Sequence, residues 1–209
     1  MKRRVPPDYW NRAKRALVRR DRVLARIIRD HPRIALEPRG KPFFTLARSI
    51  VGQQISVKAA ASIWTRLVAL APRMLPQQIL DAGYPRLVAC GLSGRKAEYV
   101  AELARHFVDG ALHVAEWAEM EDEAVITELV QVRGIGRWTA EMFLIFGMLR
   151  PDVLPLGDLG LQRAIGLNYF GGRSITPRTM LRVAAAWAPW RSVATWYLWR
   201  SLDPIPVEY

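Results

Sequence analysis

The stretch Leu129-Val-Gln-Val-Arg-Gly-Ile-Gly-Arg-Trp-Thr-Ala140 decides how the rest of the chain is interpreted. Before its glycines, apolar residues of the segment 122–131 recur at helical spacing, which predicts a helix with one apolar face. After them, a segment that opens near Arg137 is apolar almost all round, which predicts a second, buried helix. Between the two, Gly134 and Gly136 flank one apolar residue and permit a tight turn whose backbone can approach another molecule closely.

This predicted hairpin offers hydrogen-bond donors. The first N–H groups of a helix have no partner within it, so a phosphate can accept them. Arg137 and Thr139 lie beside the start of the second helix as further donors. An ordinary helix–helix connection explains the same spacing, because Gly-x-Gly alone is common. Spacing alone leaves both interpretations open.

The longer string Gly-Ile-Gly-Arg-Trp-Thr-Ala at 134–140 narrows the choice, together with Gln53-Gln54 and with Asp158, twenty residues after Trp138. This set resembles the helix-hairpin-helix DNA glycosylases of base excision repair. Within that superfamily it is most similar to the bacterial 3-methyladenine glycosylase II family. The resemblance spans roughly residues 43 to 200.

The predicted fold class is all-α, because helical periodicity recurs along the chain and no alternating strand pattern of useful length occurs. The resemblance implies one two-lobed unit over 1–209, with a cleft that contains Asp158. We expect lobe one at about 9–43 plus 158–209, lobe two at about 44–157, and the helix-hairpin-helix at about 122–149. Some members begin with a β-rich domain; only 42 residues precede Phe43 here, so we expect a compact form.

Other segments carry local signals for helices. Trp10–Arg29 is expected to be one amphipathic helix with Arg on its outer face. Ser56 is expected to cap a helix over 57–70. The run Gly91-Leu-Ser-Gly-Arg-Lys96 has two interpretations. A C-capping glycine followed by an N-capping serine is the favoured one, and a phosphate contact is the other.

Composition and charge limit the class of protein. Apolar residues make up 51% of 209, which is typical of a globular chain. The net charge is +12, and residues 1–41 hold 14 Lys and Arg against 4 Asp and Glu, so most of it lies at one end. Such a segment suits a polyanion, although a solvated helix face explains it equally well. The acidic run Glu116–Glu123 is expected on a surface away from nucleic acid.

Asp158 is the candidate catalytic residue. Pro151 and Pro155 exclude a regular helix before it, so Asp158 is expected to start one, and an N-cap role alone would explain it. The two roles are compatible, because a carboxylate at a helix N-terminus is a fixed negative charge. Cleavage of an N-glycosidic bond builds positive charge on the sugar, which this anion would stabilise. It can also orient or deprotonate the attacking water. In the resembling family, the matching aspartate is the catalytic one.

The resemblance also implies how the base is bound. Bifunctional members carry a nucleophilic lysine at the position of Trp138, and a tryptophan cannot form a Schiff base, so a monofunctional enzyme is expected. Trp138 and Trp199 match base-pocket positions, and Met142 stands where other members carry an aromatic residue. Indoles stack on cationic alkylated purines with about 1–2 kcal/mol when desolvated. The default for the other tryptophans is the core, including Trp187, Trp190 and Trp196.

The turn at Gln53-Gln54 has a plain interpretation and a functional one. Two glutamines are an ordinary polar turn. In the resembling family, this turn projects a side chain into the duplex, and the position matching that plug is Gln54. Well-known members carry an apolar wedge there. An amide fills less apolar space but can hydrogen-bond the orphaned base.

No cofactor is expected to be required. The single cysteine, Cys90, excludes an iron–sulfur cluster with four cysteines from this chain, and three histidines without ligand spacing argue against zinc. Family members bind Na⁺ or K⁺ through hairpin carbonyls, and the matching residues are Val130, Val132 and Gly134. Arg133 replaces the proline that usually precedes the first glycine.

The sequence therefore predicts a glycosylase that flips alkylated purines, such as 3-methyladenine and 7-methylguanine, out of duplex DNA and hydrolyses the glycosidic bond. One alternative is a glycosylase for uracil, mismatched or oxidised bases. Another is a noncatalytic protein that binds DNA structures through the hairpin. The expected partner is double-stranded DNA bound by a monomer. The chain has no apolar run of the ~20 residues that would cross a bilayer, so we expect no membrane association. The resemblance implies a place in the bacterial cytoplasm, at the nucleoid.

Overall fold

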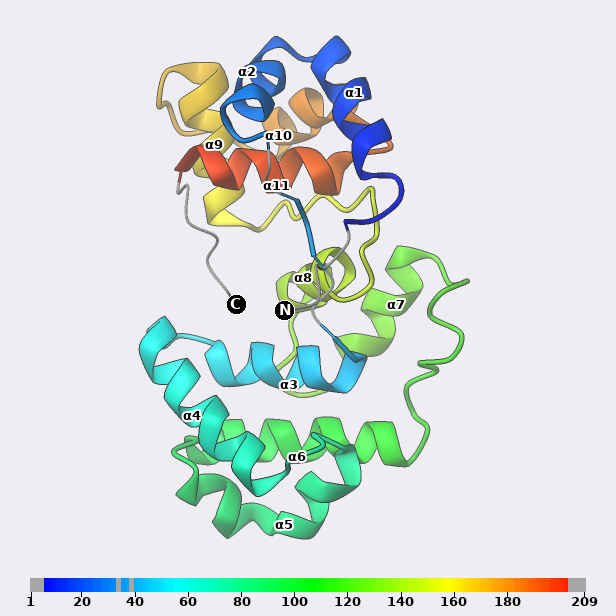
Figure 1. Ribbon diagram of the computed structural model, residues 1–209, viewed down its shortest axis with the longest axis vertical. Helices are drawn as coiled ribbons and strands as arrows, with labels where there is room; N and C mark the ends of the chain where they lie inside the picture. The colour runs from blue at the N-terminus through cyan, green and yellow to red at the C-terminus, as the bar shows by residue number, and fades with distance from the viewer. Residues whose placement is uncertain (1–5, 33–34, 38–39, 203–209) are drawn as a thin grey trace. The chain divides into compact units, whose positions relative to one another are not determined.

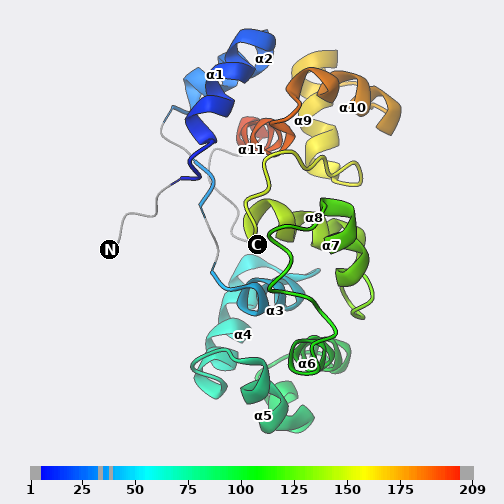
Figure 2. The same cartoon turned by 90° about the vertical axis from the view of Figure 1, so that its right-hand side faces the viewer.

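The computed structural model describes residues 6–32, 35–37 and 40–202. Over these residues the chain forms eleven α-helices and one short 3₁₀ helix, and no strand, so the predicted all-α class is confirmed (Figures 1 and 2). None of the described helices combines the length and apolar character needed to span a bilayer. The described residues divide into two compact units.

Unit 1 joins the two ends of the chain, from residues up to 37 and from 144 on. Its helices are α1 (Trp10–Arg20), α2 (Arg22–Asp30), α9 (Leu159–Phe170), α10 (Pro177–Ala184), η1 (Ala185–Trp187) and α11 (Arg191–Leu202). The helix α11 is buried on nearly all sides, and α1, α2 and α9 pack against it (Figure 1). Because both its apolar residues and its polar Ser192, Thr195 and Arg200 are buried, α11 forms the core of the unit. Trp187, Trp190 and Trp196 are buried in unit 1, as expected.

The N-terminal segment differs from its prediction. The single helix expected over Trp10–Arg29 is wrong, because the chain leaves helical geometry at Asp21, with φ of −141°. The Asp21 carboxylate caps α2 by accepting the N–H groups of Val23 and Leu24. Its other oxygen accepts Tyr169 Oη at 2.7 Å and Trp187 Nε1 at 2.9 Å. Because the Asp21 carboxylate accepts four hydrogen bonds in this non-helical conformation, the break is favoured over one continuous helix.

The segment 144–157 also differs from expectation, because it belongs to unit 1 and not to the middle lobe. It is largely non-helical after α8, as its prolines predicted. Its backbone is bonded to the start of α11: the Ser192 N–H donates to the Pro151 carbonyl, and the Val153 N–H donates to Ser192 Oγ. Asp152 accepts two guanidinium N–H groups of Arg191 at 2.7 and 2.8 Å. These bonds assign the segment to unit 1.

Unit 2 comprises the described residues 40–143. Its helices are α3 (Pro42–Gly52), α4 (Val57–Leu70), α5 (Pro76–Ala89), α6 (Gly94–Val108), α7 (Asp122–Leu129) and the first part of α8 (Arg137–Phe146). The helix α6 packs against α5 and α3 (Figures 1 and 2). Ser56 caps α4 and Ser93 caps α6, which confirms the predicted N-cap roles.

Aromatic rings link the hairpin helices to the rest of unit 2. Phe43 of α3 meets Phe107 of α6 edge to face at 5.3 Å, and Trp117 lies between Phe107 and Phe143 of α8. Trp117 is buried, and its indole N–H donates to Glu128 of α7 at 2.8 Å. One buried tryptophan therefore fixes α6, α7 and α8 together.

We expect Asp21→Ala to lower the stability of unit 1 by about 2–4 kcal/mol, because it removes a helix cap and leaves buried donors on Tyr169 and Trp187 without an acceptor. Chemical denaturation followed by tryptophan fluorescence measures this change. The matched control is Asp30→Ala at the exposed end of α2, where the expected change is within about 0.5 kcal/mol. Equal effects of the two substitutions would contradict the assigned role of Asp21.

Candidate active site

Asp158 lies at the N-cap of α9, as predicted, and its side chain is only 8% exposed. Its Oδ1 accepts the backbone N–H of Leu161 and the indole Nε1–H of Trp199, the latter at 2.9 Å. Two hydrogen bonds hold the turn before it. The Asp158 N–H donates to the Pro155 carbonyl, and Gln162 Nε2 donates to the Leu156 carbonyl. A carboxylate with this burial and these donors is fixed in direction, which suits it to electrostatic work.

Trp199 of α11 is the side chain that holds this carboxylate from outside its own helix. Its ring stacks on Phe146 with centroids 5.8 Å apart and an interplanar angle of 17°. Gly160 leaves room for the pair, because a Cβ at this position would lie 3.2 Å from Asp158 Oδ1 and 3.5 Å from the Trp199 ring. The sequence assigned Trp199 to a base pocket and missed its bond to Asp158.

The hairpin has the predicted helix-hairpin-helix form. After α7, the Ile135 N–H donates to the Val132 carbonyl, and the Ala140 N–H donates to Gly136 as α8 begins. Gly134 has φ of +89°, and a Cβ on it would lie 2.3 Å from the ring of Tyr99. A Cβ on Gly136 would meet nothing within 4 Å. Gly134 is thus required by packing and backbone geometry, whereas Gly136 presents open backbone at the surface.

The side chains at the start of α8 are arranged differently from their predicted roles. The Arg137 guanidinium bonds the carboxylates of Glu123 and Glu141, and this pairing holds the pKa of Glu123 below its usual value. Thr139 is buried, so its hydroxyl does not face solvent. Met142 is buried as well, and Trp138 is 37% exposed. The exposed surface of this turn therefore consists of backbone, the Trp138 ring and the side chains of Arg133 and Arg137.

Three motifs that the sequence left separate line one hollow of about 540 Å³ in unit 2. They are the Gln53-Gln54 turn, the first turn of α6 and the hairpin. Gln53 Nε2 donates to the Gly134 carbonyl at 2.8 Å. Lys96 Nζ donates to the carbonyls of Val51 and Gln53 at 2.7 and 2.6 Å. The hollow thus brings the predicted plug and the predicted phosphate site into one surface.

Residues 47–189 match the family model of the HhH-GPD superfamily base excision DNA repair proteins. The chain belongs to this superfamily. It is 35% identical over 167 residues to DNA-3-methyladenine glycosylase 1 of Schizosaccharomyces pombe, covering 77% of this chain and 72% of that protein. The family resemblance inferred from the sequence is therefore confirmed.

Solved structures agree with this HhH-GPD assignment. A DNA-3-methyladenine glycosidase from Bacillus halodurans superposes with a TM-score of 0.82 and 35% identity, over 91% of this chain and 89% of that chain. The 3-methyladenine DNA glycosylase of Schizosaccharomyces pombe, in complex with abasic DNA, gives a TM-score of 0.79 and 29% identity, over 91% of this chain and 96% of that chain.

The carbonyls expected to hold a cation in the HhH-GPD hairpin each keep at least one lone pair that the hydrogen bonds of the hairpin do not use. Of the three oxygens on Val130, Val132 and Gly134, the second accepts the Ile135 N–H and the third accepts the Gln53 amide. Within the described part of the chain, no group of three or more His, Cys, Asp or Glu residues could hold a metal ion.

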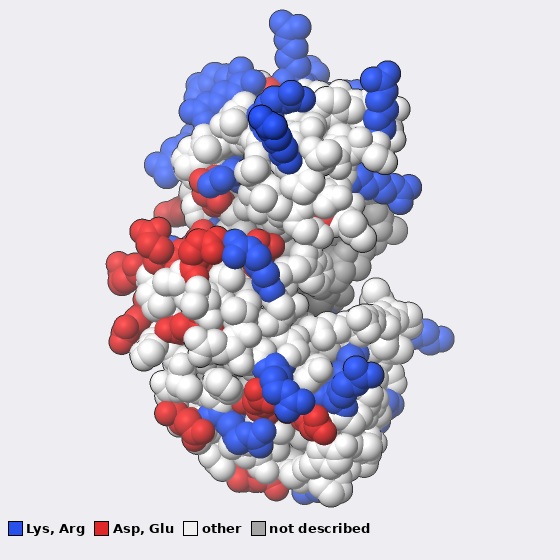
Figure 3. Space-filling view, turned by 180° about the vertical axis from the view of Figure 1, so that it is seen from behind, with Lys and Arg blue, Asp and Glu red and all other residues white. Residues whose placement is uncertain are grey.

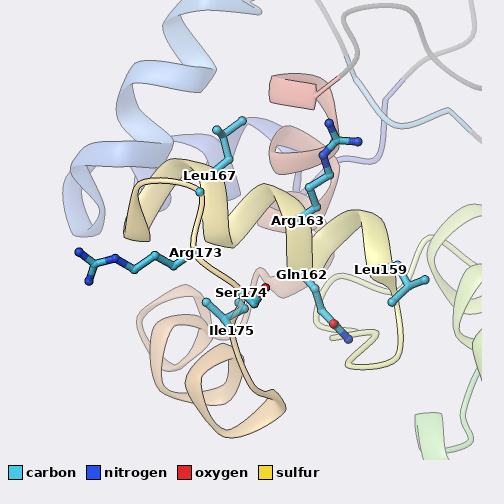
Figure 4. A pocket seen from close by; sticks show the side chains of 8 residues that line it. Leu159, Gln162, Arg163, Leu167, Arg173, Ser174 and Ile175 are labelled. Atoms are coloured by element: carbon cyan, nitrogen blue, oxygen red, sulfur yellow. The ribbon is translucent and has the colours of Figure 1, made fainter.

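Unit 1 has a second hollow, of about 380 Å³, on the outer side of α9 (Figure 4). Leu159, which is 77% exposed, lines it, but Asp158 does not. Arg163 and Arg173 also line it and extend from it in different directions (Figure 4). This hollow offers cationic and apolar surface and no carboxylate, so we assign it no part in bond cleavage.

Charge is unevenly distributed over this HhH-GPD protein. Exposed acidic residues gather over the loop before α7 and the start of that helix (Figure 3), as the run Glu116–Glu123 predicted. The exposed faces of α1 and α2 carry the predicted arginines, which are Arg12, Arg15, Arg19, Arg20, Arg22, Arg26 and Arg29. Duplex DNA would avoid the acidic surface and favour basic ones.

The two hairpin glycines provide a matched pair of substitutions. We expect Gly134→Ala to destabilise unit 2 by about 2–4 kcal/mol, because the methyl group overlaps Tyr99 and the backbone has positive φ. Gly136→Ala should change stability by less than about 1 kcal/mol, since its surroundings are open. Thermal unfolding of the two variants measures the difference. Equal losses at both positions would show that the hairpin is built differently.

Proposed function

We propose that this protein is a monofunctional DNA glycosylase that removes alkylated purines, of the 3-methyladenine and 7-methylguanine type, from duplex DNA. The observation that carries the proposal is Asp158, a nearly buried carboxylate whose Oδ1 is held by Leu161 and Trp199. Membership of a base excision repair superfamily and relatives named as 3-methyladenine glycosylases support the same reaction.

In the proposed reaction, the bond between the sugar C1′ and the base nitrogen breaks and its electron pair goes to the base. This pair neutralises the positive charge that alkylation placed on the purine. The sugar becomes positively charged, and Asp158 stabilises this charge more in the transition state than in the ground state. The carboxylate also orients the water whose oxygen bonds C1′ and whose proton is released.

The proposed enzyme leaves the sugar–phosphate backbone uncut. Trp138 occupies the position at which bifunctional relatives carry a lysine, and an indole N–H cannot form a Schiff base. We propose Trp138, Trp199 and Met142 as residues of the base pocket, with the two indole rings stacking on the cationic purine. Electron-rich indoles stack preferentially on an electron-poor ring, and this preference does not depend on the hydrogen-bonding groups of the base.

The proposed DNA contacts centre on the hollow of unit 2. Backbone N–H groups around Gly134 and Gly136 bind phosphate, and Gln54 enters the duplex where the damaged nucleotide leaves. Arg133 is exposed beside them, and its guanidinium lies 3.6 Å from carboxylate oxygens of Glu98 and Glu102 and 5.9 Å from the centre of the Tyr99 ring. It is therefore a better candidate for a phosphate contact than Arg137. We further propose a monomer that acts without an added cofactor, in the bacterial cytoplasm at the nucleoid.

Asp158→Asn tests the reaction. We expect it to reduce release of methylpurines from methylated duplex DNA by about 100-fold or more, because the fixed charge is lost. Its affinity for duplex DNA should be retained. A parallel gel without alkali should show an intact backbone for the wild type. Equal release by the variant would remove Asp158 from the mechanism. Release of another base class would identify a different glycosylase, and no release from any lesion would indicate a binding protein.

Trp199→Phe tests the role of the indole N–H. The substitution keeps a ring on Phe146 but removes the donor to Asp158, so we expect kcat to fall about tenfold with little change in KM, given that a charge-assisted hydrogen bond contributes about 1.5–3 kcal/mol. Trp190→Phe makes the same chemical change elsewhere in unit 1 and should leave kcat unaltered. A kcat for Trp199→Phe equal to that of the wild type would show that Asp158 is positioned without it.

A further inference from the structure

The Gln53-Gln54 turn contains a strained residue at the position of the proposed plug. Gln54 is exposed and has φ of +56°, in the left-handed region that residues with a Cβ rarely adopt. Such a conformation costs about 1–2 kcal/mol, and it persists only when the surrounding structure enforces it. The contacts around Gln54 should therefore show what enforces it.

Lys96 supplies the first of these contacts. Its ammonium group donates to the Val51 carbonyl at 2.7 Å and to the Gln53 carbonyl at 2.6 Å, so it bridges the end of α3 and the residue before Gln54. The side chain is half-buried and burial lowers the pKa of Lys96, as expected of a cation that has exchanged water for protein oxygens. Two short charge-assisted hydrogen bonds fix this turn more firmly than neutral ones would.

Gln53 supplies the second contact. Its amide donates to the Gly134 carbonyl at 2.8 Å, and Gly134 packs against Tyr99 of α6. Tyr99 follows Lys96 by three residues on the same helix. These contacts connect the end of α3, the first turn of α6 and the hairpin to one another, and Gln54 lies in the turn that they hold.

We propose that Lys96 is a positioning residue for the Gln54 plug. Gln53 fixes the turn that carries the plug to the hairpin, so that the distance between the bound phosphate and the inserted Gln54 side chain is constant. The inference rests on the proposed function, because it assigns Gln54 to the duplex. It gives Lys96 a role inside the protein, although a lysine on a DNA-binding surface would ordinarily be assigned to phosphate.

Arg95 is the matched neighbour for the test. It lines the same hollow and is exposed, whereas the ammonium of Lys96 is turned to two carbonyls. Removal of a phosphate contact lowers the slope of log affinity against log salt by about one. Removal of a positioning lysine should leave that slope unchanged and impair base extrusion instead.

The experiment compares Lys96→Met with Arg95→Met on a duplex that carries 2-aminopurine beside a methylated purine. For Lys96→Met we expect extrusion and single-turnover excision at saturating protein to fall at least about tenfold, because small misplacements of positioned groups reach 10²-fold effects. Its salt slope on undamaged duplex should equal that of the wild type. For Arg95→Met we expect a lower slope and full extrusion at saturation. A lower slope with full extrusion for Lys96→Met would overturn the proposal.

Two further measurements keep the test decisive. Lys96→Arg retains the charge but alters the donor geometry, so extrusion should fall while the salt slope stays. Hydrogen exchange at the amide of Gln53, whose N–H donates to the Ile50 carbonyl, measured without DNA, should be faster in Lys96→Met. Unchanged exchange there would refute the proposal that Lys96 holds this turn. If the wild type neither extrudes nor excises, the proposed function fails, and hydrogen exchange still decides whether Lys96 holds the turn.

Discussion

The constraint on which unit 1 depends is the burial of the Asp158 carboxylate. A charged group removed from water must be given hydrogen-bond donors, and it receives them from Leu161 on its own helix and Trp199 on α11. The Trp199 bond also ties α11, the core helix, to the start of α9. This arrangement favours Gly160, since a Cβ there would lie 3.2 Å from Asp158 Oδ1, tighter than most contacts of a real Cβ, and in ordinary contact with the Trp199 ring. The proposed catalytic group and the core helix of the unit thus share a stabilising contact.

Unit 2 also satisfies polar groups through side chains from other elements, but here the groups are backbone carbonyl acceptors. Its turns leave carbonyl oxygens unpaired, and distant side chains supply the donors: Gln53 to Gly134, and Lys96 to Val51 and Gln53 itself. Satisfying a turn by a side chain from another helix is more restrictive than satisfying it by water, because it fixes two elements at once. The Gly134 carbonyl, expected to bind a cation, is engaged by an amide for this reason. The proposed DNA-binding surface is therefore held in one arrangement by contacts within the protein.

The sequence predicted what depends on neighbouring residues and missed what depends on distant ones. Ser56, Ser93 and Asp158 cap helices as expected, because a cap bonds N–H groups two or three residues away. The bonds of Trp199 to Asp158 and of Lys96 to Val51 join residues 41 and 45 positions apart, and no local pattern carries that information. The break at Asp21 was predictable in part: the residue type favours an N-cap, but apolar periodicity on both sides of it dominated the interpretation.

The geometry at Asp158 also bears on which bases the proposed enzyme can release. Two N–H donors on Oδ1 spread the negative charge, so this carboxylate stabilises a sugar cation less than an unpaired one would. The Trp199 N–H is committed to Asp158, so this indole offers the base its ring face and not its donor. Such a site suits a base whose bond is already weak and whose ring is already positive. An alkylated purine supplies both properties itself, whereas a neutral base would need proton donation and a stronger electrostatic field.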